Sequence, residues 1–307
     1  MLRTATLGDL TLLIVLAAMY GSAFSAIAVA VPAVGPFALV LCRVVIAFAI
    51  LAPVCLGRGW LWPTSPTGWG QVVFLSLFNL LIPFFLVSWA QLTVNASLMA
   101  LIMGAGPIFG LLIAHLATDD DRLTPAKALG VLLGFGGIAL VLGGDAFSGK
   151  SDTGWRSYAA PAAALLASFF YAASGLLVRR TQALPPTQLA TLVLGMGGLG
   201  LLLTLPFTWS GLTVALAAAK SGHWLAIGYL GVVTTGLAYI LRYRLIRTVG
   251  MGYFGISIYL VPVFGIAVAA LTLSEPLSPT LLIGLALVVG GLLIARVSPR
   301  AANTPPS

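Results

Sequence analysis

Two polar side chains within long apolar stretches of the chain could take part in binding. Asn79 lies near the middle of the uncharged stretch 68–90, and Thr234, followed by Thr235, lies 155 positions later in a similar stretch. A side-chain amide or hydroxyl can hold the carboxylate or the amino group of a small molecule. The alternative role is a hydrogen bond between helices, worth about 0.6 kcal/mol. We predict that Asn79 and Thr234 line a binding pocket.

Aromatic, methionine and serine side chains at similar depth are further candidates for this pocket. Rings suit apolar or aromatic groups, a tyrosine hydroxyl can bond a polar group, and methionine adapts to mixed shapes. Each could instead pack in the core, and a serine often bonds only its own helix. The predicted pocket residues of this group are Tyr20, Ser22, Phe78, Met99, Met103, Tyr171, Ser174, Tyr239 and Tyr259.

Arg43 is the only basic side chain well inside one of the long apolar stretches, about six residues from the end of its stretch. A long side chain at that depth can carry its charged head to the membrane interface. We therefore expect Arg43 to contact a carbonyl or an outer loop rather than a bound molecule.

The sequence lacks the residue sets that several other activities require. No Asp or Glu lies near the middle of an apolar stretch, and His115 and His223 are close to the ends of theirs. Proton coupling normally requires a titratable group at depth, hydrolysis a nucleophile beside a base, and ATP use a phosphate-binding loop. We expect no enzyme, no metal and no cofactor, and the lack of a buried fixed charge favours solutes without net charge.

The composition indicates the class of protein, and therefore the kind of secondary structure that carries these residues. The chain is 60% hydrophobic and 7% charged, whereas a soluble domain carries about 25% charged residues. This predicts an all-α polytopic membrane protein. A net charge of +8 would suit nucleic acid in a soluble protein, but here the basic residues flank the apolar stretches. We expect no nucleic-acid partner.

Charged residues divide the sequence into stretches of about 20 residues, the length that a membrane-spanning helix needs. We predict ten spans, at 10–30, 37–56, 68–90, 96–117, 126–144, 158–178, 189–209, 222–241, 250–273 and 280–295. Pro32 to Pro36 would form a turn between the first two spans, and 212–219 a surface loop or short helix.

The basic residues also predict the orientation. Loops on one side carry 11 Lys and Arg residues and loops on the other side carry 3, and basic loops stay in the cytoplasm. Both termini are therefore predicted to be cytoplasmic. Tryptophans would mark the two interfaces, with Trp60, Trp62 and Trp69 inside and Trp89, Trp155, Trp209 and Trp224 outside.

One segment occurs twice, at 107–137 and 262–291. Pro107, Phe109, Gly110, Leu116 and Asp120 match Pro262, Phe264, Gly265, Leu271 and Glu275 at an offset of 155, and Gly130, Gly136 and Gly137 match Gly284, Gly290 and Gly291 at an offset of 154. Since each half has five spans, the chain is predicted to contain two inverted five-helix repeats. Their bounds would be 1–145 and 158–296, with an outer linker at 146–157 and a cytoplasmic tail at 297–307. Asp120 would lie at the inner face and Glu275 at the outer face.

The repeated prolines and glycines have separate expected roles. Pro107 and Pro262 lack an N–H and would release the carbonyls of Met103 and Ile258, which permits a hinge with a free carbonyl facing the pocket. The alternative is a static kink. Glycines would let helices approach closely, at Gly104, Gly106, Gly110, Gly130, Gly134, Gly284, Gly290 and Gly291.

This pattern resembles the drug/metabolite transporter superfamily and, within it, the EamA-type ten-helix transporters, most closely the YddG-type amino-acid exporters. The resemblance rests on Tyr20-Gly21-Ser22, on Arg43, on the two Pro-x-Phe-Gly segments, and on the acidic residue and glycine-rich span after each. It implies a central cavity lined by spans 1, 3, 4, 6, 8 and 9, with spans 5 and 10 as an outer scaffold.

Together these features predict a transporter of the inner (plasma) membrane. It would export aromatic or neutral amino acids, or similar small metabolites, downhill and by alternating access. The alternatives are efflux of drugs or general metabolites by proton antiport, and a scaffold or sensor that transports nothing. The expected partners are the solute and the lipid bilayer, and the expected state is a monomer or a weak homodimer.

Overall fold

The computed structural model describes residues 4–57, 59–117, 124–147, 154–180, 184–249 and 251–297, and the regular elements in these ranges are all helical. The elements of the first half are α1 (Leu7–Leu56), α2 (Pro66–Leu75), η1 (Ser76–Leu81), α3 (Ile82–Ala90), α4 (Ala96–Met103), α5 (Gly106–Ala117) and α6 (Pro125–Phe147). Those of the second half are α7 (Arg156–Arg180), α8 (Pro186–Leu203), α9 (Leu205–Ala218), α10 (Ser221–Tyr229), η2 (Leu230–Leu237), α11 (Ala238–Val249), α12 (Met251–Leu273) and α13 (Pro279–Val297).

The first two predicted spans form one 50-residue helix with a break at its centre. Gly35 has φ 75° and ψ 164°, which is not helical, and Pro32 and Pro36 flank it. A residue with positive φ is easily supplied by glycine, and each proline removes a helical hydrogen bond. The predicted turn at 32–36 is therefore a sharp change of direction within α1.

The third and eighth predicted spans each contain a π-helical segment at equivalent positions. In the first half η1 separates α2 from α3, and in the second half η2 separates α10 from α11. An offset of 155 carries 76–81 onto 231–236, which lies within η2. Asn79 and Thr234 lie in these segments. π-Helical segments are rare in proteins, and those that occur often lie at functional sites.

The two repeated prolines behave differently. Pro107 lies in the first turn of α5, just after a break between α4 and α5, whereas Pro262 lies inside the continuous helix α12. The carbonyl of Met103 accepts a hydrogen bond from Ser168 Oγ of α7 at 3.5 Å. The expectation of a free Met103 carbonyl facing the pocket was therefore wrong, because a neighbouring helix supplies the missing donor.

The seventh predicted span is shorter than expected. α8 ends at Leu203, and α9 follows at an angle of 91°. Pro206 occupies the first turn of α9, where its missing N–H costs nothing. Trp209, predicted to end a span, thus lies in α9, and the segment predicted as a surface loop or short helix is the second half of that helix.

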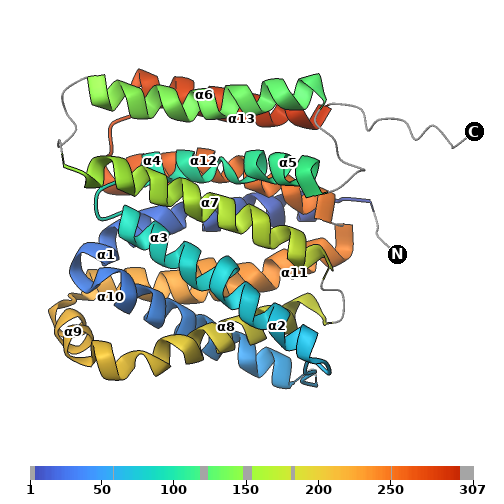
Figure 1. Ribbon diagram of the computed structural model, residues 1–307, viewed down its shortest axis with the longest axis vertical. Coiled ribbons are helices and arrows are strands. Elements are labelled where there is room, and N and C mark those ends of the chain that lie inside the picture. The colour runs from blue at the N-terminus through green and yellow to red at the C-terminus, as the bar shows by residue number, and fades with distance from the viewer. Residues whose placement is uncertain are drawn as a thin grey trace, which may run out of the picture.

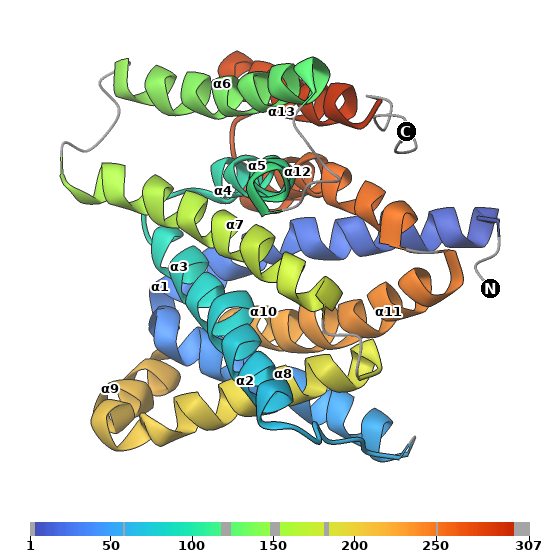
Figure 2. The same ribbon diagram turned by 45° about the vertical axis from the view of Figure 1, so that its right-hand side comes forward.

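α6 and α13, the fifth and tenth predicted spans, run side by side at one edge of the molecule (Figures 1 and 2). A Cβ added to Gly137 would lie 2.7 Å from the carbonyl oxygen of Gly284, and a Cβ added to Gly291 would lie 2.6 Å from that of Gly130. The repeat offset of 154 interchanges these two contacts, so the pair follows the two-fold relation of the halves. Added Cβ atoms at Gly110 and Gly290 would meet open space, so those two predicted close approaches were wrong.

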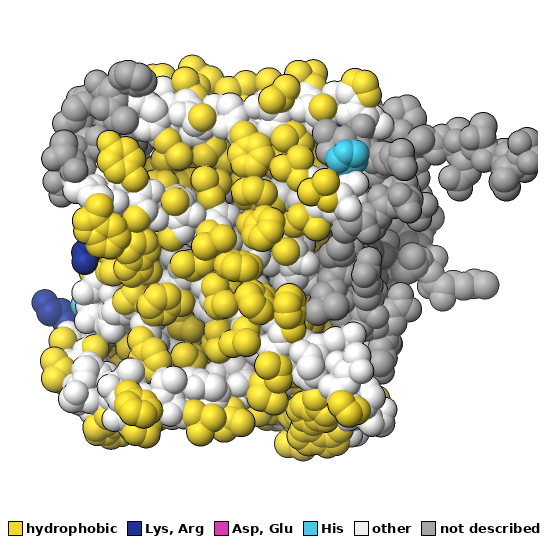
Figure 3. Space-filling model, viewed as in Figure 1, with side chains coloured by type: hydrophobic (Ala, Val, Ile, Leu, Met, Phe, Trp, Pro, Cys, Tyr) yellow, Lys and Arg dark blue, Asp and Glu magenta, His cyan; other side chains and the backbone are white. Residues whose placement is uncertain are grey.

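The surface of the bundle is apolar over its sides. Large hydrophobic side chains are exposed on many helices, including Leu132 at 70% and Phe207 at 89%. In Figure 3 hydrophobic side chains are spread over the described part of the face in view, and the Lys and Arg side chains visible in this view lie at its left edge. Within the described ranges, six helices are long and apolar enough to cross a membrane, or seven if the bent pair α8–α9 counts as one. The 50-residue α1 is one of the six, although it corresponds to two predicted spans.

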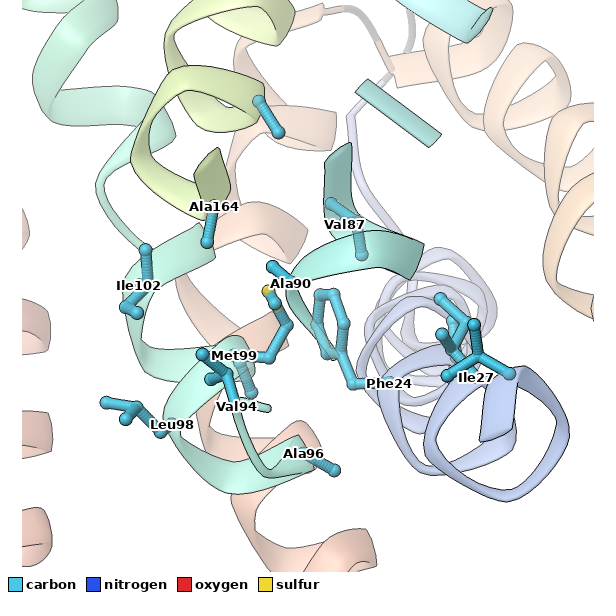
Figure 4. Packing of buried hydrophobic residues seen from close by; sticks show 14 of the residues in the cluster. Phe24, Ile27, Val87, Ala90, Val94, Ala96, Leu98, Met99, Ile102 and Ala164 are labelled. Carbon is cyan, nitrogen blue, oxygen red and sulfur yellow. The ribbon is translucent and has the colours of Figure 1, made fainter. Parts of the chain in front are cut away.

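The apolar core joins the two halves. Phe24 and Ile27 of α1 pack with residues of α3, α4 and α7 (Figure 4) and with Ile266 of α12. Met99 is fully buried in this cluster, beside Ala90 and Phe24. In the described structure Met99 packs among apolar side chains.

The tryptophan stacks and the ends of the chain relate to the predicted assignment of residues to the two membrane interfaces. Trp60, Trp62 and Trp69 stack in sequence, with ring centroids 5.3 and 5.9 Å apart, and Trp89 stacks on Trp155 at 6.0 Å. Each stack thus joins tryptophans predicted for the same interface. α1 begins and α13 ends at the same end of the bundle (Figure 1). The predicted position of Asp120 lies outside the described residues.

Candidate binding site between the two halves

Arg43 is buried in the interior, with 9% of its surface exposed. Its Nε donates a hydrogen bond to Thr235 Oγ1 at 2.7 Å, and one of its terminal nitrogens donates to Thr234 Oγ1 at 3.4 Å. The guanidinium also lies over the ring of Phe84, 4.0 Å from its centroid. The expected contact with an outer loop was therefore wrong. Arg43 of the first half instead donates its hydrogen bonds to two threonines of η2 in the second half.

Three of the predicted pocket tyrosines surround this arginine. Tyr20 of α1, Tyr171 of α7 and Tyr239 of α11 all lie within electrostatic range of Arg43. Each tyrosine ring is partly buried, so its apolar body packs while the hydroxyl remains near the charge. The structure thus brings residues from both halves into one polar cluster, which we call the Arg43 cluster: Arg43, Thr234, Thr235, Tyr20, Tyr171 and Tyr239.

Asn79 reaches the same region through a chain of hydrogen bonds. Its Nδ2 donates to Ser174 Oγ at 2.6 Å, and Ser174 Oγ donates to the carbonyls of Phe170 at 2.6 Å and Tyr171 at 3.2 Å. Ser174 is buried and Asn79 is partly buried. Asn79 of η1 is thereby joined to α7 beside a tyrosine of the Arg43 cluster. Both roles considered for Asn79, an interhelical bond and a pocket surface, are compatible with this geometry.

A second arginine approaches the cluster from the other end. Arg242 of α11 interacts with the hydroxyl of Tyr20 by a hydrogen bond, and its guanidinium lies 4.9 Å from the ring centroid of Phe254 and 6.0 Å from that of Tyr239. The sequence places Arg242 in a basic inner loop, but α11 continues to Val249 and carries it inward. Tyr20 lies within electrostatic range of both arginines.

The remaining predicted residues occupy other positions. Ser22 Oγ is 2.6 Å from the hydroxyl of Tyr229, which closes a second contact between the halves near Tyr20. Phe78 packs against Phe170 with ring centroids 5.5 Å apart, and Met103 and Tyr259 lie at the edge of the apolar cluster that contains Met99. The structure therefore gathers Tyr20, Tyr171, Thr234 and Tyr239 directly, Asn79 and Ser174 through hydrogen bonds, and leaves Met99, Met103, Phe78 and Tyr259 in apolar surroundings.

A groove of about 260 Å³ is lined by apolar residues only. Phe37 and Val40 of α1, Leu201 of α8, and Leu81, Ile82, Phe85 and Leu86 at the junction of η1 and α3 line it. None of the predicted binding residues is among them. The Arg43 cluster is the better candidate site, because it concentrates the polar side chains in the interior.

From the sequence, Arg43 was expected to make only a structural contact. Arg242, Phe84 and Tyr229 were not predicted as site residues. The signal for Arg43 was present, since a charge at depth in a membrane helix is usually functional. The others had no distinguishing signal, because their contacts join residues far apart in sequence. Ser22 and Tyr229, for example, are separated by 207 positions.

Comparison with known proteins agrees with this architecture. The EamA-like transporter family matches the chain twice, at residues 7–143 and 159–297. The chain belongs to the EamA-like transporter family. Members of this family are membrane transporters and not enzymes, so the predicted class is confirmed.

Two curated relatives are each 25% identical to this EamA-like chain. One is the "Probable terminal-alkyne amino-acid exporter" of Streptantibioticus cattleyicolor, aligned over 68% of this chain and 67% of the relative. The other is the "Uncharacterized transporter YxxF" of Bacillus subtilis, aligned over 58% of this chain and 54% of the relative. A crystal structure with 20% sequence identity aligns over 95% of this chain and 97% of its own, with a TM-score of 0.64. At that identity the likeness shows the fold alone.

Proposed function

We propose that this EamA-like transporter exports neutral or aromatic amino acids, or closely similar metabolites, across the inner (plasma) membrane. The observation that carries the proposal is the Arg43 cluster, in which hydroxyl groups and a guanidinium from both halves meet in an apolar bundle. Such groups can hold the carboxylate and amino groups of an amino acid, and the tyrosine rings can hold its side chain. The relative from Streptantibioticus cattleyicolor, which is named as a probable amino-acid exporter, supports the same substrate class.

The proposed orientation has ten spans, both termini in the cytoplasm and two inverted repeats at 1–145 and 158–296. α1 would supply the first two spans, on either side of Gly35, and α8 would reach the outer side before α9 turns along it. The stacked tryptophans and the apolar sides of the bundle support this arrangement. The proposed unit is a monomer or a weak homodimer within the bilayer.

The proposed mechanism is alternating access around the Arg43 cluster. Inverted repeats can exchange their conformations, so that the site opens to each side in turn. The two repeats differ in form here, because the helix is broken before Pro107 and continuous through Pro262. Exchange of the broken and continuous forms between the halves would open and close the two ends of the site.

An efflux screen with the purified protein in liposomes tests the substrate class. Labelled phenylalanine, leucine and valine would be compared with lipophilic cations, with protein-free liposomes as the control. Faster efflux of the amino acids supports the proposal. Faster efflux of the cations alone would replace it with multidrug efflux, and the absence of any solute-dependent flux would favour a scaffold or sensor.

The same liposomes test the driving force. No described residue places a carboxylate or histidine at the middle of a span, which supports downhill transport. Efflux should therefore continue at an unchanged rate when an ionophore collapses the pH gradient. Strict dependence on the gradient would show proton antiport instead.

A further inference from the structure

The charge of Arg43 has no carboxylate partner among the residues that the structure describes. Its described partners are the two threonine hydroxyls, the ring of Phe84 and nearby tyrosines. The carboxylates whose contacts are described bond elsewhere: Asp9 accepts hydrogen bonds from Thr6, and Glu275 accepts them from the first residues of α4. A guanidinium in a dry interior is costly unless an anion or several acceptors compensate it.

The geometry leaves one edge of the guanidinium available. Arg43 uses its Nε and one terminal nitrogen for the threonines, on the side of η2. No described residue accepts a hydrogen bond from its other terminal nitrogen. A guanidinium binds a carboxylate best through two parallel N–H groups, and its fixed planar shape makes this contact selective.

The surroundings of that charge suit an anionic group and exclude a cation. Arg242 reaches Tyr20, and Tyr20 lies within electrostatic range of both arginines. Two positive charges near one tyrosine, of which Arg43 is buried and Arg242 is partly buried, would repel a lipophilic cation. The tyrosine hydroxyls can donate to a carboxylate, and Asn79 lies one hydrogen-bonded serine away from Tyr171.

We propose that Arg43 binds the carboxylate of the transported solute in a bidentate contact, and that this contact restricts the substrates to carboxylate-bearing molecules, zwitterionic or anionic. This inference rests on the proposed function and makes it more specific. It also corrects the sequence-based argument for solutes without net charge, because that argument assumed an interior with no fixed charge.

The test compares an amino acid with its amide. Wild-type protein in liposomes would first be assayed with labelled phenylalanine, leucine and valine. The amino acid carried fastest would then compete with its own unlabelled acid, its carboxamide and the corresponding amine. We expect the amide and the amine to compete at least about 10-fold more weakly than the acid, since a hydrogen bond to a charged group is lost.

Variants of Arg43 locate the recognition. Arg43→Gln should lower transport of the amino acid about 10-fold or more and should abolish the preference for acid over amide. Arg43→Lys keeps the charge without the planar fork and should retain part of both. Arg242→Lys, which keeps a charge near Tyr20, should preserve the preference. If Arg43→Gln fails to fold, the wild-type comparison and Arg43→Lys still decide the matter.

The outcomes are distinct. Equal competition by acid and amide overturns this inference while amino-acid transport stands. An unchanged acid preference in a folded Arg43→Gln variant moves carboxylate recognition to another residue and also overturns it. Transport of none of the amino acids by wild-type protein overturns the proposed function, and this inference with it.

Discussion

Gly104 lies directly against Pro262, so that a Cβ added to Gly104 would be 3.0 Å from Pro262 Cγ. The end of α4, three residues before the repeated proline segment of the first half, thus meets Pro262 of the second half, where α12 continues without a break. A broken helix in one half packs on a continuous helix in the other. This contact gives the proposed exchange between the halves a specific location.

Replacing Pro107 by alanine should slow transport without weakening the fold. The substituted residue would provide an N–H for the Met103 carbonyl, which now accepts a long hydrogen bond from Ser168, and α4 and α5 could join into one helix. We expect a several-fold lower transport rate in liposomes and an unfolding temperature that is equal or higher. Pro262→Ala is the matched variant. Normal rates in both variants would exclude the prolines from gating.

Glu275 of the second half should stabilise α4 of the first half. Its carboxylate accepts hydrogen bonds from the backbone N–H groups of Ala96 at 2.9 Å and Ser97 at 2.8 Å, two donors that the start of a helix leaves unsatisfied. Glu275→Gln should lower the free energy of unfolding in detergent by about 1 to 2 kcal/mol, because charge-assisted hydrogen bonds are lost. Thr272→Ala, an exposed change one turn earlier, should alter it little; equal effects of the two changes would refute the capping role.

Neighbouring glycines of α6 should respond in opposite ways to the same substitution. Gly137→Ala would place a Cβ 2.7 Å from the carbonyl oxygen of Gly284, whereas Gly136→Ala would extend into open space. The first change should separate α6 from α13 and lower the unfolding temperature clearly. The second should leave it unchanged or raise it, because alanine is the better helix former. Similar temperatures for the two variants would contradict the close packing of this pair.

The hydrogen bond between Asn79 and Ser174 should matter for transport more than the hydrogen bond of a buried serine within its own helix. Asn79→Ala removes the hydrogen bond at 2.6 Å between η1 and α7 and should lower transport several-fold with little loss of folded protein. The matched control is Ser257→Ala, since Ser257 is buried but bonds the carbonyl of Phe254 in its own helix. A purely structural role for Asn79 would instead lower stability and transport together.

The helices could be predicted from the sequence because apolar stretches bounded by charges or prolines have a direct physical meaning in a membrane. Gly35 with its two prolines and the paired glycines of α6 and α13 are local signals of this kind. The bend after Leu203 had a signal in Pro206, but the apolar run through it concealed the end of the span. Arg242 was assigned to a loop for the reverse reason, since α11 continues past its apolar part.

The site could be predicted only in part, because its contacts depend on packing between the halves. Thr234, Tyr20, Tyr171 and Tyr239 were recognisable as polar or aromatic groups at depth. The bond from Arg43 to Thr235 joins residues 192 positions apart, and no local pattern indicates such a pair. The π-helical segments at η1 and η2 likewise have no pattern in the residue types, although both contain a predicted site residue.

Counterflow in liposomes that hold the wild-type protein is the most direct test of alternating access around the Arg43 cluster. Vesicles loaded with unlabelled amino acid would be diluted into a trace of the labelled form, without any ion gradient. Alternating access around one site predicts a transient accumulation of label inside that exceeds equilibrium and that Asn79→Ala reduces. Label that merely equilibrates, or that accumulates no faster than in protein-free vesicles, would contradict the account.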